Sequence, residues 1–166
     1  ATSQVSIFAA QSQPGELSAR TEMTSVANHH RIRHAHMVGI SPAIMRKGMR
    51  ADFRQIDAFS QRLVERARAV TRIRCSTRAG TDFEAEFSPT LNWLKTSGII
   101  QKEKWGNLPG GEILTSPLTA NGIFVVDGVI GDYLCARYGD LRETPLTIEV
   151  ENSRIRSMGS ENKKLL

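Results

Sequence analysis

The sequence predicts an α+β protein with a helical N-terminal third followed by a mainly antiparallel β-sheet domain. Three observations predict this class: an amphipathic helical pattern after Asp52, a change from helical to strand periodicity near residue 71, and short apolar segments separated by Gly, Pro and Asn after residue 112. With 166 residues, 40% of them hydrophobic, the chain has the composition of a globular protein. It lacks the roughly 18 consecutive apolar residues of a membrane span, so we expect no membrane partner.

The N-terminal third alternates strand and helix signals. Residues 5–10 (VSIFAA) predict a strand, a helix is expected over residues 16–28, and residues 31–40 (RIRHAHMVGI) predict a second strand. Ser41 and Pro42 then match the N-cap and first position of a short helix, because a proline needs no backbone donor there. We interpret this region as small elements dominated by helices.

The middle of the chain contains the clearest helix and a hairpin. Asp52 is expected to cap a helix whose apolar residues share one stripe and whose last turn is basic. Residues 71–77 (TRIRCST) and 81–87 (TDFEAEF) then alternate apolar and charged side chains. Their opposed arginines and glutamates predict an antiparallel pair.

Further strands are expected in the second half of the chain. The segments are 112–117 (EILTSP), 122–128 (GIFVVDG), 129–135 (VIGDYLC), 145–152 (PLTIEVEN) and 154–159 (RIRSMG). Residues 160–166 (SENKKLL) are expected to form a flexible tail.

Charge and cysteine content limit the function classes. The net charge is +5, and the basic residues crowd the region before Gly80. They are Arg46, Lys47, Arg50, Arg54, Arg62, Arg66, Arg68, Arg72, Arg74 and Arg78. Since no aromatic pattern for base stacking accompanies them, a solvated basic face is the preferred interpretation and a nucleic-acid surface the alternative. Cys75 and Cys135 lack a paired spacing, and the N-terminus has no secretory pattern, so we expect reduced thiols and a cytoplasmic protein.

All four histidines fall between residues 29 and 36. In a strand, His34 and His36 would share a face and could gather zinc together with His29 or His30. Arginines between them would repel a cation, so a polar edge or turn is the preferred interpretation.

The segment 105–114 (WGNLPGGEIL) is the most distinctive loop. Gly106 and Gly111 have the spacing of the P-loop glycines, but Glu112 and Ile113 occupy the positions of its lysine and its Ser or Thr. A carboxylate there would repel phosphate. Glu112 is left to meet a metal, a ligand amine or a neighbouring donor.

Several segments, in this order, resemble the thermophilic metallo-aminopeptidase family, also called leucyl aminopeptidase T, which includes a dihydroxypyridine dioxygenase. They are residues 20–53 (RTEMTSVANHHRIRHAHMVGISPAIMRKGMRADF), 79–87 (AGTDFEAEF), 105–117 (WGNLPGGEILTSP), 121–131 (NGIFVVDGVIG) and 145–159 (PLTIEVENSRIRSMG). The most specific part is NLPGGE followed by TSP. The resemblance implies the central part of that fold. It also implies a division into residues 1–51, a remnant of a larger domain, residues 52–159, the aminopeptidase-like domain, and the tail.

The same resemblance implies an incomplete metal site. Glu112 matches the first metal ligand of those enzymes, whereas their other ligands follow the segment that resembles residues 147–159. A hydrolytic metal site needs about three protein ligands. We therefore expect no bound metal or other cofactor and no catalytic residues, so the chain is not expected to be an enzyme.

Truncated relatives of this kind resemble the peptide-binding proteins of crocagin-type ribosomal peptide biosynthesis. The resemblance implies a non-catalytic protein, expected as a homodimer, that holds a precursor peptide for biosynthetic partner enzymes. The expected peptide-binding residues are Trp105, Asn107, Glu112, Ile113 and Thr115. Core, turn and salt-bridge roles are the ordinary alternatives for Trp105, Asn107 and Glu112. The alternative functions are a metal-dependent peptidase or dioxygenase completed across a dimer, and a basic nucleic-acid-binding or regulator-binding protein.

Overall fold

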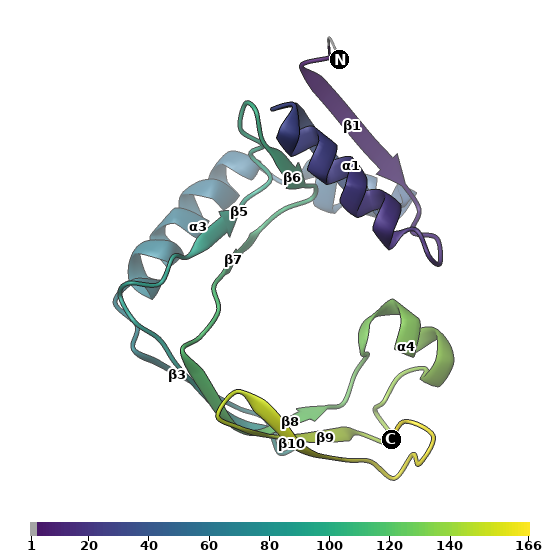
Figure 1. Ribbon diagram of the computed structural model, residues 1–166, viewed down its shortest axis with the longest axis vertical. Helices are drawn as coiled ribbons and strands as arrows, with labels where there is room; N and C mark the ends of the chain where they lie inside the picture. Colours follow the sequence, from purple (N-terminus) through teal and green to yellow (C-terminus); the bar gives the residue numbers. More distant parts are fainter. Residues whose placement is uncertain (1–2) are drawn as a thin grey trace. The chain divides into compact units, whose positions relative to one another are not determined.

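The chain forms two structural units (Figure 1). In the computed structural model, which describes residues 3–166, unit 1 extends to Ala67 and resumes over Asn92–Thr115. Unit 2 comprises Arg68–Leu91 and Ser116–Leu166. Each unit therefore contains a segment from the middle of the sequence.

Unit 1 begins with a parallel sheet. Strands β1 (Val5–Ala10), β2 (Arg33–Val38) and β6 (Trp105–Asn107) pair in the order β1-β2-β6. Helix α1 (Leu17–His29) connects β1 to β2 and packs on β2 and β6. The expected helical N-terminal third is therefore wrong, because strands and helices alternate there. Parallel strands require such a crossover connection, and its helix covers the sheet.

The rest of unit 1 packs one long helix on a two-stranded sheet. Two short helical turns, α2 (Pro42–Arg46) and η1 (Gly48–Arg50), lead into α3 (Phe53–Ala67). Helix α3 packs against β5 (Leu94–Thr96) and β7 (Glu112–Leu114), which pair antiparallel.

Side-chain caps begin α2 and α3, as the sequence predicted. The Ser41 hydroxyl accepts a hydrogen bond from the Ile44 amide at 3.3 Å. The Asp52 carboxylate accepts from the amides of Arg54 and Gln55 at 3.0 and 3.2 Å. These caps satisfy donors that a helix leaves free at its first turn.

Unit 2 contains a five-stranded antiparallel sheet in the order β10-β9-β8-β4-β3. Its strands are β3 (Arg72–Ser76), β4 (Asp82–Glu86), β8 (Thr119–Val126), β9 (Leu146–Glu151) and β10 (Arg154–Gly159). The expected hairpin is confirmed as β3–β4. Arg74 meets Asp82 at 2.8 Å and Arg72 meets Glu84 at 3.4 Å on its charged face.

One segment expected as a strand is helical. Residues 129–135 were predicted to be extended, but α4 (Gly131–Tyr138) covers most of them. A short apolar run does not distinguish strand from helix by its composition. The helix ends at Gly139, whose φ of 72° lies in the left-handed region that glycine adopts without strain.

Few apolar residues among residues 3–166 are buried, and three of them are alanines. The buried apolar residues are Ala27, Ile32, Met37, Val64, Ala67, Ala120, Leu141 and Leu146. Within the described chain, no helix is long and apolar enough to cross a lipid bilayer.

Candidate functional site

A polar contact holds α3 against the β5 side of its sheet. The Asp57 carboxylate lies 2.9 Å from the Lys95 ammonium and accepts a short hydrogen bond from the buried Ser97 hydroxyl. The Ser97 bond, followed by the bond from Lys95, lowers the pKa of Asp57. The charged form of Asp57 therefore fixes the orientation of α3 relative to β5 and β7.

Glycines shape the turn that leads into β7. A Cβ atom on Gly110 would lie 2.5 Å from the backbone nitrogen of Gly98 and 3.2 Å from the Asn107 carbonyl oxygen. The two chain segments thus approach too closely for any side chain at Gly110. Backbone packing thus explains the glycine at position 110, and Glu112 argues against use of the loop as a phosphate cradle.

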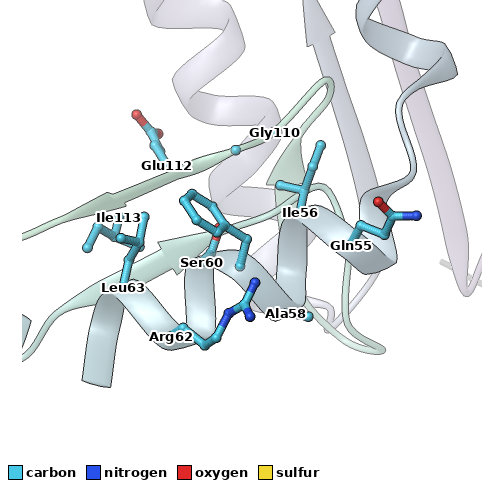
Figure 2. A pocket seen from close by; sticks show the side chains of 11 residues that line it. Gln55, Ile56, Ala58, Ser60, Arg62, Leu63, Gly110, Glu112 and Ile113 are labelled. Atoms are coloured by element: carbon cyan, nitrogen blue, oxygen red, sulfur yellow. The ribbon is translucent and has the colours of Figure 1, made fainter. Parts of the chain in front are cut away.

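An open groove of about 750 Å³ lies between α3 and β7 (Figure 2). Its lining residues are Gln55, Ile56, Ala58, Phe59, Ser60, Arg62, Leu63, Gly110, Gly111, Glu112 and Ile113. Its volume is within the range of small-ligand sites. Its apolar part is formed by the side chains that α3 does not bury in the unit, and Phe59 is 55% exposed.

The groove runs beside an unpaired strand edge. Strand β7 pairs with β5 through the register Leu94–Leu114, Lys95–Ile113 and Thr96–Glu112. No other strand in residues 3–166 pairs with β7. Since β5 contributes no residue to the lining, the groove lies on the β7 side of the sheet. Backbone donors and acceptors at such an edge are available to another extended chain.

The structure places the two expected site residues of β7 on opposite faces. Figure 2 shows Ile113 directed toward Leu63 of α3 and Glu112 directed away from the helix. The Glu112 carboxylate accepts a hydrogen bond from the Thr96 hydroxyl at 3.1 Å. Ile113 therefore contributes an apolar side chain to the groove, and Glu112 contributes mainly its backbone.

The other three expected site residues lie elsewhere in unit 1. Trp105 and Asn107 belong to β6 of the parallel sheet, where they pair with His34 and His36. The Thr115 hydroxyl donates to the Asn92 carbonyl at 3.0 Å. Of the five expected residues, the groove lining therefore includes Glu112 and Ile113.

Trp105 instead borders a buried polar row on the parallel sheet. The Ser6 hydroxyl lies 2.7 Å from His34 Nδ1, and His34 Nε2 lies 3.2 Å from His36 Nδ1. The His36 ring stacks on Phe8 and meets the Trp105 ring edge-on, with centroids 4.9 and 6.2 Å apart. His34 and His36 do share a strand face, as expected.

Burial lowers the pKa of both histidines. For His34 burial is the cause, whereas for His36 the nearby His34 and Arg20 lower the pKa further and Glu16 opposes them. A hydrogen bond links the two rings, and a second one links His34 to Ser6. This row contributes to the packing of the sheet.

Sequence reasoning missed the helical wall of the groove. On α3, Ser60, Val64 and Ala67 are buried, whereas Ile56, Phe59 and Leu63 form a neighbouring, partly exposed row. Two adjacent apolar rows make the stripe wider than one packing surface requires. The extra width of this apolar stripe is the sequence signal that could have predicted the helical wall of the groove.

The donor groups near Glu112 do not fit the metal site that the family resemblance implies. Among the described side chains, no three of His, Cys, Asp or Glu are grouped so that they could hold an ion. Zinc sites in proteins use three or four such ligands. Glu112, with Thr96 as its hydrogen-bond partner, offers a single carboxylate.

Comparison with known proteins shows the fold. No protein-family model matches the chain, and no curated protein matches it. Among solved structures, 2,5-dihydroxypyridine dioxygenase from Pseudomonas putida KT2440 matches with a TM-score of 0.64 and 14% sequence identity, covering 95% of this chain. The chain spans 43% of that enzyme's length. It thus shares an α+β fold of the aminopeptidase T type.

Proposed function

We propose that this chain is a non-catalytic peptide-binding protein that holds an extended segment of a precursor peptide for partner enzymes. The observation that carries the proposal is the unpaired edge of β7 beside the open groove along α3. The link to ribosomal peptide biosynthesis and the expectation of a role without catalysis both come from the sequence resemblance.

An extended peptide fits this arrangement because the β7 edge would contact its backbone and the groove would contact its side chains. The β7 edge would exchange main-chain hydrogen bonds with the peptide, and alternate peptide side chains would enter the groove. Ile56, Phe59 and Leu63 form the apolar wall that would receive them. Burying one aliphatic side chain contributes roughly 1.5–3 kcal/mol. With a few backbone bonds and the cost of ordering the peptide, we expect a Kd on the order of micromolar.

Phe59 provides the sharpest test of the groove. Because its ring is 55% exposed, Phe59→Ala removes binding surface with little effect on the core. Synthetic precursor peptides from ribosomal natural-product pathways are titrated by calorimetry into the wild type and the variant, with and without EDTA. For a peptide that binds, we expect affinity to fall about tenfold in Phe59→Ala, and the chelator to have no effect.

Tyr133→Ala is the matched control, because Tyr133 is an exposed aromatic residue on α4 of unit 2. It should leave affinity within about twofold of wild type. Failure of every peptide to bind, or binding that Phe59→Ala leaves unchanged, would contradict the proposal.

A further inference from the structure

Two arginines continue the groove along α3. The hollow formed by Phe59, Arg62, Leu63, Glu65 and Arg66 has a volume of about 690 Å³. It shares Phe59, Arg62 and Leu63 with the groove beside β7. The two hollows therefore share part of their lining, and the second one adds Arg66 in the last turn of α3.

The guanidinium groups of Arg62 and Arg66 are available for a ligand. Among the side chains that the structure describes, no carboxylate lies within ion-pair distance of either, and both residues are exposed. The Arg62 guanidinium carbon lies 5.8 Å from the centroid of the Phe59 ring. A guanidinium held near an aromatic ring retains outward N–H donors suited to a carboxylate.

The acidic residue of this hollow is already engaged. Glu65 accepts a hydrogen bond from Gln61 at 3.2 Å, on the side of α3 that also carries the Lys95 contact. The hollow therefore contains two arginines, Arg62 and Arg66, and one carboxylate, Glu65, which already accepts a hydrogen bond from Gln61. The local charge is positive, in keeping with the chain's net charge of +5.

The spacing of the two arginines matches an extended peptide. Residues four apart in an α-helix rise about 6 Å along its axis. Alternate residues of a β-strand lie about 6.8 Å apart and point to the same side. A peptide that adds to β7 could thus direct two alternate side chains at Arg62 and Arg66, with a third over Phe59 and Leu63.

We infer that the peptide bound in this groove is acidic. An apolar side chain lies over Phe59 and Leu63, and two carboxylates at the following alternate positions pair with Arg62 and Arg66. This inference rests on the proposed function and adds the chemistry of the ligand to it.

Fluorescence anisotropy with short labelled peptides tests the inference. The probe carries a leucine with glutamates two and four residues later, and a reversed copy covers the other strand direction. A second version replaces both glutamates with glutamine, and a third places them next to each other. For the better direction, we expect about tenfold tighter binding of the spaced-glutamate probe than of the glutamine version. Adjacent glutamates should lose part of this advantage, because neighbouring strand side chains point to opposite faces.

Paired variants locate the effect. Arg62→Gln with Arg66→Gln should remove the preference for glutamate, whereas Arg46→Gln with Arg50→Gln, which changes net charge equally, should retain it. Arg46 and Arg50 are exposed residues of unit 1 outside α3. Arg62→Glu with Arg66→Glu should instead prefer a lysine version of the probe, a reversal that loss of folding would not produce.

The outcomes separate the inference from the proposed function. Equal binding of glutamate and glutamine probes, each weakened by Phe59→Ala, would overturn the acidic specificity and leave peptide binding standing. Absence of binding by all probes and precursor peptides would overturn both. Tighter binding of a single-stranded oligonucleotide, lost in Arg62→Gln with Arg66→Gln, would overturn the inference in favour of nucleic acid.

Discussion

The central strand of the parallel sheet in unit 1 buries polar side chains, whereas the edge strands of the sheet in unit 2 expose apolar ones. On β2, His34 and His36 are 2% and 5% exposed. In unit 2, every residue of β3 and β10 is exposed, including Ile73, Ile155 and Met158. Polar side chains on β2 are thus buried, while apolar side chains on β3 and β10 are exposed.

Hydrogen bonding and packing explain this difference. Hydrogen bonds link Ser6, His34 and His36, so burying this row beneath a covering helix costs less than burying unpaired polar groups. In unit 2, cross-strand register places Phe83, Phe124 and Ile148 on the face opposite the Arg–Asp and Arg–Glu pairs. The hydrophobicity of single residues therefore does not indicate which strand supports stability. Hydrogen bonding of the buried side chains and coverage of the sheet by other elements do.

Removal of the His34 side chain should cause the largest loss of stability in unit 1. His34→Ala deletes a buried ring and leaves Ser6 and His36 without their partner, so we expect a loss of about 3 kcal/mol in the free energy of unfolding of unit 1. Both tryptophans, Trp93 and Trp105, belong to unit 1, so urea unfolding followed by tryptophan fluorescence reports it. His30→Ala, at an exposed position, is the control, and equal losses in the two variants would contradict a structural role for the row.

Acidification should produce a smaller, selective loss of stability in unit 1. Burial lowers the pKa of His34 and His36 in the folded state, so below about pH 6.5 the unfolded chain binds protons that the folded unit does not. Stability is complete above that pH and decreases as pH falls toward the folded pKa values.

Unit 2 contains none of the four histidines, and Arg74 lowers the pKa of Asp82 by hydrogen bonding. The stability that unit 2 gains from the ionised Asp82 carboxylate should therefore decrease only below about pH 4. Amide hydrogen exchange at pH 7.5 and 5.5, corrected for intrinsic rates, should show loss of protection in β2 but not in β4. Equal loss in both strands would contradict the assignment.

The apolar face of unit 2 should be the least sensitive. Ile73 is 43% exposed on β3, so Ile73→Ala should cost below about 1 kcal/mol. Hydrogen exchange of the β3–β4 amides measures this cost directly. A loss as large as that of His34→Ala would mean that the face is covered in solution.

Local signals in the sequence were sufficient for many elements. Strand β1, the capped helices after Ser41 and Asp52, and the β3–β4 hairpin depend on neighbouring residues, and their patterns predicted them. The parallel pairing of β2 with β6 joins residues about seventy positions apart, and no local pattern encodes it. The helix α4 was missed because its short apolar run is compatible with either structure.

In the candidate site, too, local features could be predicted from the sequence, whereas features that depend on distant residues could not. The sequence singled out the loop of residues 105–114, and its turn at Gly110 leads into the strand edge that borders the groove. The opposite wall comes from α3, which precedes the loop by some fifty residues and joins it only through tertiary packing. Glu112 and Ile113 were named together, but strand alternation places their side chains on opposite faces.

A backbone methylation scan tests most directly whether β7 accepts a peptide strand. In a peptide that binds, each amide is N-methylated in turn, and binding is measured by calorimetry. Because only alternate amides of an added strand face β7, methylation should weaken binding strongly at every second position and much less between them. A uniform response along the peptide, or none, would contradict strand addition at this edge.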